Sequence, residues 1–199
     1  MSIKDITIVV TSFKSNEVIK HCLNSIDEQC KVLIVENSSD LEFKKNIENE
    51  FKNVECILTG DNLGYSKANN IGLKKVKTKY ALILNPDATL ENSTLKNFFE
   101  IVNKVPDFAI ISPYIQDAKN KNEKAVIKNS LPISVNNVKG FAMFLNLSEF
   151  ENIGFFDENF FIYFEEIDLC KRLIENRKKI YLVPSIKINH LGGKSHDVS

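Results

Sequence analysis

The chain of 199 residues is 43% hydrophobic, which is sufficient for one globular domain with a sizeable core. Lys plus Arg and Asp plus Glu number 26 each, so the chain has no broad basic surface of the kind that neutralises nucleic acids, and no nucleic-acid partner is expected. No apolar run reaches the ~20 residues that span a bilayer, the N-terminus has no secretory pattern, and the four cysteines form no CxxC pair. We therefore expect a cytoplasmic protein with reduced thiols.

In the first half of the chain, short apolar runs alternate with segments whose apolar residues recur at helical spacing. The apolar runs predict strands at residues 6–11, 31–36, 54–58 and 80–84. The periodic segments predict helices at residues 16–27, from the capping cluster 37–40 to about residue 51, at 66–76 and at 90–105. Four alternations of strand and helix with short connections predict a doubly wound α/β sheet with parallel strands.

The second half of the chain has a different character. We expect a strand at 108–112, a polar mobile loop or hairpin tip at 117–124, a strand at 140–147, a helix at 165–176 and short strands at 180–183 and 186–189. The aromatic-rich residues 155–164 are assigned to core packing rather than to a lipid-linked ligand or a membrane surface. No repeat or linker interrupts the chain, so one domain, 1–199, is expected.

The predicted strand 80–84 stops abruptly at a polar turn that carries one carboxylate, Asp87. In open α/β sheets ligands bind just past the carboxyl ends of the strands. Pro86 restricts the backbone of Asn85, so the Asp87 carboxylate is held in place, and a hard oxygen ligand there suits a divalent cation and the phosphates that it neutralises. An ordinary strand-end turn explains the same residues and stays open as the simpler interpretation.

Polar groups also follow the first two strands, namely Ser12 and the pair Glu36 and Asn37. These ends lie on the same edge of a parallel sheet as Asp87 and can converge on one ligand. The segment 61–70 adds Gly64 before a helix whose N-terminus favours an anion. Neither GxGxxG nor GxxxxGK[ST] occurs, which removes the dinucleotide fingerprint and the P-loop.

Two further features carry candidate chemistry. Glu165, Glu166 and Asp168 begin a predicted helix after a run of aromatics, where helix-dipole placement explains them as well as a general-base role does. Glu165 and Asp168 share one helix face, while Glu166 points elsewhere. His190 follows a short strand and is either a packing residue or a neutral imidazole ligand to the same cation as Asp87, beside a phosphate-contacting loop at 192–195.

Taken together and in order, these segments resemble family 2 glycosyltransferases, especially the rhamnosyltransferase-like branch. The resemblance covers almost the whole chain, and the matching segments are residues 9–13, 35–39, 62–70, 84–88, 139–143, 154–158, 165–169 and 183–195. It implies the GT-A fold, with a mostly parallel central sheet flanked by helices and a smaller antiparallel part in the C-terminal half. The nucleotide-binding half is expected at about residues 1–113 and the acceptor and catalytic half at about 114–199.

The resemblance also implies a reaction. It is an inverting, metal-dependent transfer of a sugar from a nucleotide-diphosphate donor, of the dTDP-rhamnose or UDP-sugar type, to a hydroxyl of a polysaccharide or a lipid-linked glycan. Peripheral association with the inner face of the membrane fits such an acceptor. Asp87 is implied as the ligand of a Mg²⁺ or Mn²⁺ ion, which His190 approaches.

The same resemblance assigns the remaining site residues. Glu166 matches the position of the catalytic base, and Glu165 and Asp168 would organise it. The residues implied in nucleotide-sugar binding are Thr11, Ser12, Glu36, Asn37, Asn62, Gly64, Asn69, Asn85 and Gly140.

The chain also departs from the family pattern. Glu36 and Glu166 stand where the family usually has Asp, and the chain stops soon after the His190 motif. These differences motivate an alternative, a non-catalytic sugar-nucleotide-binding module of a larger glycan-assembly complex. A nucleotidyltransferase is a third interpretation, although residues 12–16 lack the glycine-rich loop that it uses.

Overall fold

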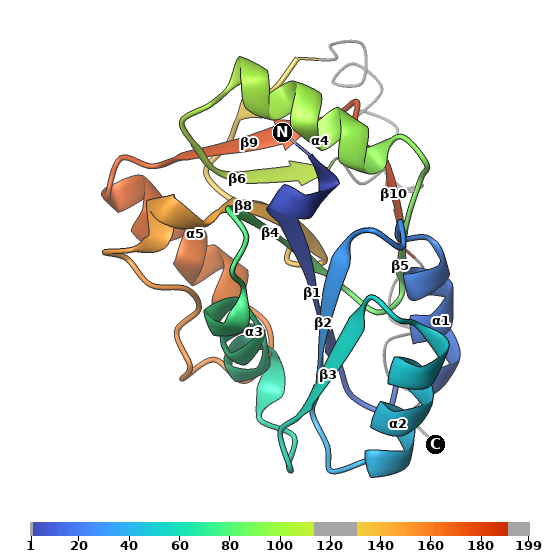
Figure 1. Ribbon diagram of the computed structural model, residues 1–199. Helices are drawn as coiled ribbons and strands as arrows, with labels where there is room; N and C mark the ends of the chain where they lie inside the picture. The colour runs from blue at the N-terminus through green and yellow to red at the C-terminus, as the bar shows by residue number, and fades with distance from the viewer. Residues whose placement is uncertain (1, 114–130, 191–199) are drawn as a thin grey trace, which may run out of the picture.

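The computed structural model describes residues 2–113 and 131–190, in which helices cover both faces of one large sheet (Figure 1). The strands are β1 (Ile6–Ser12), β2 (Lys31–Glu36), β3 (Val54–Leu58), β4 (Tyr80–Leu84), β5 (Ala88–Leu90), β6 (Phe108–Pro113), β7 (Ile133–Ser134), β8 (Ala142–Asn146), β9 (Lys179–Val183) and β10 (Ile188–His190). The helices are α1 (Asn16–Asn24), α2 (Leu41–Glu50), α3 (Gly64–Lys75), α4 (Thr94–Lys104) and α5 (Glu165–Glu175), with 3₁₀ turns at Ile3–Asp5 and Leu147–Phe150.

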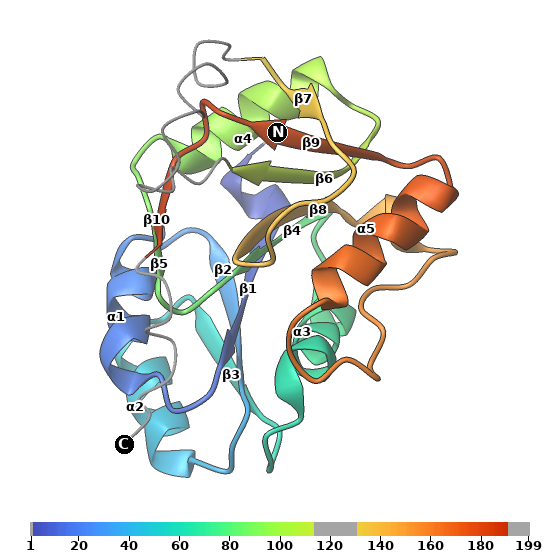
Figure 2. The same ribbon diagram turned by 180° about the vertical axis from the view of Figure 1, so that it is seen from behind.

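The sheet is mostly parallel and has an antiparallel part in its C-terminal half, as the family resemblance implies. Its order is β3-β2-β1-β4-β8-β6-β9-β7 in the described residues. The pairs from β3 to β4 are parallel, whereas β8 runs antiparallel to both β4 and β6. Strand β8 therefore joins the sheet of the first half to strands β6 and β9 (Figure 2).

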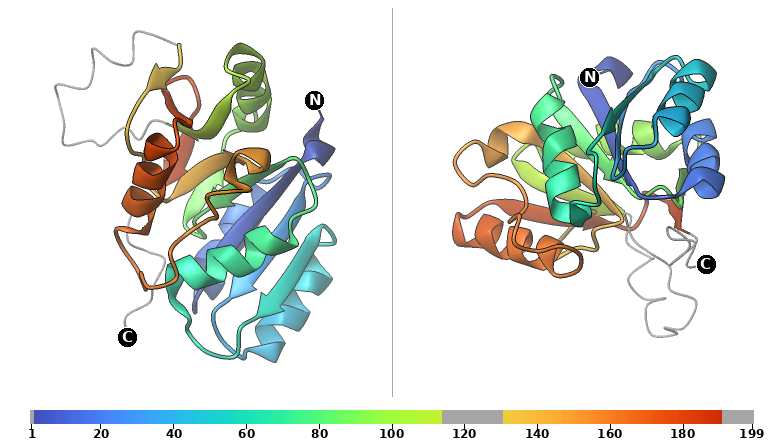
Figure 3. Two further views of the ribbon diagram at one scale, coloured as in Figure 1. Left: turned by 90° about the vertical axis from the view of Figure 1, so that its left-hand side faces the viewer. Right: turned by 90° about the horizontal axis from the view of Figure 1, so that it is seen from below.

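Each face of the sheet has its own apolar core because side chains alternate along the strands. On β1, Ile8 and Val10 face the core that α1, α2 and α4 cover, whereas Val9 faces the core under α3 and α5. The view from below in Figure 3 shows α1 and α2 on one side of the sheet and α3 and α5 on the other. Burial on both faces explains why these strands read as continuous apolar runs.

At Gly72, helix α3 packs on the sheet with no room for a side chain. A methyl group on Gly72 would stand 2.5 Å from Val9 Cγ1 and 3.1 Å from Val35 Cγ2. Both neighbours are β-branched side chains in the packed core and cannot move aside easily. This close approach fixes how far the N-terminal turn of α3 lies from the strand ends.

We expect Gly72→Ala to lower the free energy of unfolding by about 1–3 kcal/mol, the usual cost of overpacking a core. Val9→Ala removes the atom that the new methyl group meets, so the double variant should lose less stability than the sum of the two single variants. Urea denaturation of all four proteins measures this coupling. Additive losses would show that the helix moves freely at this position.

The structure differs from the sequence prediction in several places. Helix α4 begins at Thr94 rather than residue 90, because Ala88–Leu90 form β5, which pairs with β10. The sequence predicts that the aromatic segment 155–164 packs in the core. Phe156 is buried as predicted, but the prediction is wrong for residues 161–164, where Phe161, Tyr163 and Phe164 are 55%, 71% and 65% exposed. The predicted loops at 117–124 and 192–195 lie outside the described residues.

Candidate active site

The carboxyl ends of β1 and β2 form one wall of the candidate site. Ser12 and Glu36 stand opposite each other in the parallel pair, and the Asn37 N–H donates to the Ser12 carbonyl at 2.8 Å. Both Ser12 and Glu36 are buried, and one carboxylate oxygen of Glu36 accepts a long bond from the Lys14 N–H at 3.5 Å. The predicted convergence of these two strand ends is therefore present in the structure.

Several buried polar atoms around this edge have no hydrogen-bond partner among residues 2–113 and 131–190. They include Thr11 Oγ1, Ser12 Oγ, Glu36 Oε2, Ser66 Oγ, Asn69 Oδ1, Glu165 Oε2 and Glu166 Oε2. A buried polar group without a partner costs free energy, so such groups are rare in folded proteins unless a ligand or water completes them. They lie on the strand ends of β1 and β2, on the first two turns of α3 and on the first turn of α5, and this concentration indicates a polar ligand there.

Asp87 and His190 are brought together by the small sheet of β5 and β10. His190 pairs with Ala88 in this sheet, and its Nε2 lies 3.2 Å from Asp87 Oδ1. The Asp87 side chain is fully buried, and the Phe141 ring lies beside the His190 imidazole, with centroids 4.8 Å apart. Burial and the charge of Asp87 raise the pKa of the nearby Cys22 thiol to about 12, so Cys22 stays protonated at neutral pH.

Asn85 and Gly140 meet through Tyr65, on the first turn of α3. The Tyr65 hydroxyl donates to the Gly140 carbonyl at 2.7 Å and lies 3.4 Å from Asn85 Oδ1. The backbone N–H of Asn85 also donates to Phe141 O at 2.8 Å. The turn before Asp87 is thus tied to the segment that leads into β8.

The first turn of α5 supplies two carboxylates to the same place. Glu165 is buried, and burial followed by the charge of Glu166 raises its pKa above the usual value. Glu166 is partly buried, and its Cβ lies 3.7 Å from the position that a Cβ on Gly140 would occupy. The backbone turns into α5 through Tyr163 and Phe164, whose φ angles of 68° and 71° are left-handed. This turn directs Glu165 inward while the two aromatic rings stay exposed.

The raised pKa of Glu165 predicts a pH-dependent stability. A carboxyl group that holds its proton more tightly in the folded state stabilises the protein fully below its unfolded pKa of about 4.5, and this stability is lost as the pH rises through the folded pKa. Glu165→Gln is neutral throughout, so relative to wild type it should gain about 1.4 kcal/mol per unit of pKa shift between acidic and neutral pH.

Denaturation between pH 4 and 8, with chelator and without nucleotide, measures this difference. The matched control is Glu151→Gln, because Glu151 is an exposed glutamate outside the site. Identical pH profiles for Glu165→Gln and wild type would contradict the prediction.

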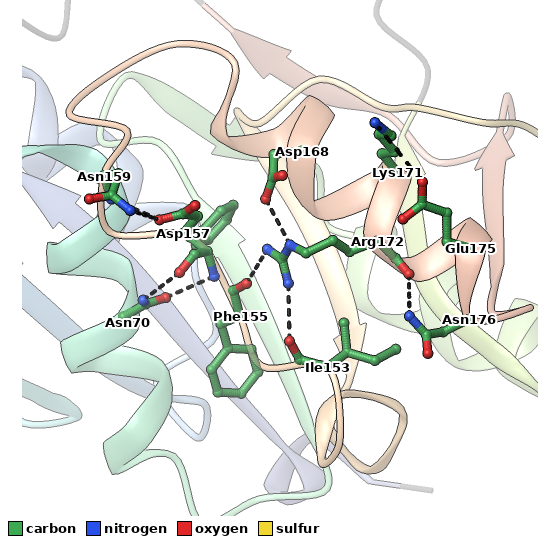
Figure 4. Close-up of polar contacts among 11 residues, drawn as sticks. Asn70, Ile153, Phe155, Asp157, Asn159, Asp168, Lys171, Arg172, Glu175 and Asn176 are labelled. Atoms are coloured by element: carbon green, nitrogen blue, oxygen red, sulfur yellow. Dashed lines mark hydrogen bonds and ion pairs between the residues drawn. The ribbon is translucent and has the colours of Figure 1, made fainter.

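Asp168 has a different environment from the two glutamates. Its carboxylate accepts from Arg172 Nε at 2.8 Å, and the same guanidinium donates to the carbonyls of Ile153 and Phe155 at 3.1 and 2.5 Å (Figure 4). From the other side, Asn70 exchanges two hydrogen bonds with the backbone of Phe156. Asp168 therefore helps to hold the segment before α5, consistent with an organising rather than a reacting position.

Asn37, Asn62 and Gly64, all predicted in nucleotide-sugar binding, contact one another at the start of α3. Asn37 is buried and donates through Nδ2 to the Gly64 carbonyl at 3.2 Å. Asn62 is exposed, and its Oδ1 accepts from the Gly64 N–H at 3.1 Å. Gly64 has a φ of 82°, and a Cβ on it would stand 2.4 Å from Phe161 O, so only glycine fits. These contacts build the N-terminus of α3, while Asn69 keeps one buried oxygen unpaired in the described chain.

The donor atoms at Asp87 and His190 fit a cation that is shared with a ligand. In residues 2–113 and 131–190 no group of three or more His, Cys, Asp or Glu side chains could enclose a metal ion. Mg²⁺ and related ions are commonly held by one or two carboxylates together with substrate phosphates and water. One carboxylate and one imidazole therefore suit an ion whose other ligands come from phosphates rather than a closed protein cage.

Sequence reasoning assigned no role to Tyr65, although it lies inside one of the matching segments. A tyrosine on an amphipathic helix looks like a core residue, and no periodicity distinguishes the two cases. Within the described parts of the chain, no helix has the length and apolar character needed to cross a membrane.

Residues 7–170 match the family described as glycosyl transferase family 2, and the chain belongs to this family. It is 29% identical over 190 residues to the low-salt glycan biosynthesis hexosyltransferase Agl10 of Haloferax volcanii, covering 84% of this chain and 61% of Agl10. It is 26% identical to the rhamnosyltransferase WbbL of Escherichia coli K12, covering 92% of this chain and 82% of WbbL.

A solved structure shares the fold at low sequence identity. The mannosyltransferase PcManGT of Pyrobaculum calidifontis, solved in complex with GDP-Man and Mn²⁺, matches with a TM-score of 0.76 at 14% identity, over 92% of this chain and 55% of that one. The predicted GT-A architecture is thereby confirmed. The chain spans little more than half the length of PcManGT and 61% of Agl10.

Proposed function

We propose that the protein is an inverting, metal-dependent glycosyltransferase that uses a nucleotide-diphosphate sugar, of the dTDP-rhamnose or UDP-sugar type, as donor. The acceptor is a hydroxyl of a polysaccharide or a lipid-linked glycan. The observation that carries the proposal is that Tyr65 and Gly140 join the Asn85–Asp87 turn to the first turn of α5. The Tyr65 hydroxyl lies 2.7 Å from Gly140 O and 3.4 Å from Asn85 Oδ1, and Glu166 Cβ lies 3.7 Å from the position of a Cβ on Gly140. A strand-end carboxylate and a pair of helix carboxylates therefore share one site, and the membership of glycosyltransferase family 2 supports a sugar donor for it.

In this proposal the nucleotide lies along the ends of β1 and β2. Thr11, Ser12 and Glu36 each have a buried oxygen without a partner in the described chain. The two hydroxyls can donate hydrogen bonds to a base or ribose, and all three oxygens can accept them. Asn69 and the N-terminal turn of α3 contribute polar groups beside them. The similarity to WbbL and Agl10 supports a rhamnose or hexose as the transferred sugar.

Asp87 and His190 would hold the divalent cation, which when bound supplies Lewis-acid neutralisation of the diphosphate leaving group. The chain itself supplies the proton acceptor. Glu166 would take the proton of the acceptor hydroxyl as that oxygen attacks the anomeric carbon from the face opposite the diphosphate. One displacement of this kind inverts the anomeric centre, and it requires no nucleophile from the protein.

The first test is donor binding. Titration calorimetry with UDP, dTDP and GDP, each with Mn²⁺, with Mg²⁺ and with chelator, should reveal at least one nucleoside diphosphate whose binding needs the metal. The matched nucleoside monophosphate should bind more weakly because it lacks the second phosphate. If none of the nucleoside diphosphates binds with either metal, the proposal is wrong.

The substitution of Glu for the usual Asp at positions 36 and 166 favours the second candidate, a non-catalytic module that binds a sugar nucleotide. The same protein preparation distinguishes the two functions. Tight, metal-dependent binding of a nucleotide sugar with neither transfer nor slow hydrolysis of that donor would support the module and reject the enzyme.

A further inference from the structure

Tyr65 is held by its backbone on two sides. Its N–H donates to Phe161 O at 2.7 Å, and its carbonyl accepts from Asn69 Nδ2 at 2.9 Å. Gly64, the preceding residue, lies so close to Phe161 that any side chain on it would collide with the Phe161 carbonyl. The N-terminal turn of α3 is therefore fixed directly to the segment that leads into α5.

The Tyr65 side chain reaches two other parts of the site. Its hydroxyl bonds the Gly140 carbonyl and lies near Asn85 Oδ1, at 2.7 and 3.4 Å. Its ring packs edge-to-face on Phe156, with centroids 6.0 Å apart. One residue thus contacts the turn before Asp87, the segment before β8 and the segment before α5, which come from distant parts of the sequence.

The hydroxyl works as a hydrogen-bond donor. Burial, and then the charges of Glu165, Glu166 and Asp87, raise the pKa of Tyr65 above its usual value, so the phenol keeps its proton. A hydroxyl has one proton to give, and the shorter distance assigns that proton to Gly140 O. The Asn85 side chain then keeps acceptor capacity for a ligand.

We propose that Tyr65 is a positioning residue for sugar transfer, whose hydroxyl sets the spacing between the Asn85–Asp87 turn and Glu166 beside Gly140. This inference rests on the proposed function. The donor would be held at the turn and the acceptor hydroxyl at Glu166, so the spacing fixes the distance between the two reacting atoms. Misplacement by about 1 Å costs up to roughly 100-fold in rate.

The test compares Tyr65→Phe with Thr78→Val. Tyr65→Phe keeps the ring and its packing on Phe156 and removes only the hydroxyl. Thr78→Val removes another hydroxyl, which lies 2.9 Å from Thr7 Oγ1 and 2.8 Å from Tyr80 O. Thr78 precedes β4, at the opposite end of that strand from Asp87. This variant is a control for the loss of stability alone.

We expect Tyr65→Phe to lower kcat by about 10- to 100-fold while the donor KM changes less than about threefold, because the donor contacts themselves remain. Thr78→Val should lower Tm about as much as Tyr65→Phe does, but its kcat should equal that of the wild type. The inference is overturned if Tyr65→Phe has a kcat within twofold of wild type, or if Thr78→Val loses as much.

Amide hydrogen exchange provides a readout that does not require activity. Without the Tyr65 hydroxyl, the Asn85 N–H, which donates to Phe141 O, should exchange at least about tenfold faster than in wild type and in Thr78→Val. Unchanged exchange at Asn85 overturns the inference even if the wild-type protein transfers no sugar. If the wild type transfers no sugar but Asn85 exchanges faster in Tyr65→Phe, the proposed function is rejected while the positioning contact is established.

Discussion

Asp87→Asn is expected to abolish the metal-dependent binding of a nucleoside diphosphate, with a loss of affinity greater than about 100-fold in the presence of Mn²⁺ or Mg²⁺. In the proposed site this carboxylate is the charged oxygen ligand that follows β4, and the interaction of a cation with it and with the phosphates is worth several kcal/mol. The amide has nearly the same shape but no charge. Titration calorimetry with and without chelator measures the effect.

The matched control is Asp107→Asn. Asp107 directly precedes β6 and pairs on the surface with Lys179, away from the carboxyl ends of the strands. It should leave nucleotide affinity unchanged and lower stability by less than about 1 kcal/mol, as exposed ion pairs do. If Asp87→Asn still binds the nucleoside diphosphate with the metal dependence of the wild type, Asp87 is not a ligand in the proposed cation site.

Glu166→Gln is expected to retain donor binding within about threefold but to lose transfer by about 10²- to 10⁴-fold, the range that general-base catalysis contributes. Glutamine keeps the size of the side chain beside Gly140 but cannot accept a proton. Single-turnover transfer and donor calorimetry on the same preparation separate the two effects. Transfer at the wild-type rate would refute the assignment of Glu166 as the base.

Glu165→Gln is the informative comparison for this variant, because both glutamates begin α5 and both have an oxygen without a partner in the described chain. If Glu165 organises the site rather than taking the proton, its variant should transfer faster than Glu166→Gln. The reverse order would exchange the two roles while leaving the proposed reaction intact.

The sequence predicted the first half of the fold well because buried parallel strands are apolar on both faces. The strands at 31–36, 54–58 and 80–84 have the predicted bounds. The short strand β5 was missed, since three residues carry no measurable period and the strand exists only through its pairing with β10, about 100 residues away. This pairing brings His190 to Asp87. The sequence patterns around His190 could not show this, so they left two alternatives open, a cation ligand or a packing residue.

The aromatic segment was misassigned for a related reason. Apolar composition predicts burial in general, but it does not reveal backbone direction. The left-handed φ angles at Tyr163 and Phe164 turn the chain so that Glu165 is buried and the two rings are exposed. The sequence assigns no role to Tyr65 because its contacts with Gly140, Asn85 and Phe161 form only in the folded chain.

The order of strands in the large sheet has a consequence for how this protein is made. Strand β6 pairs with β8 and β9, and both follow it in the chain. When a ribosome has released the first 113 residues, β1 to β4 can already pair with one another. The hydrogen-bonding groups of β6 still lack β8 and β9. Translation of residues 142–183 must therefore precede docking of β6, and the nascent chain carries an apolar strand with open edges for that interval.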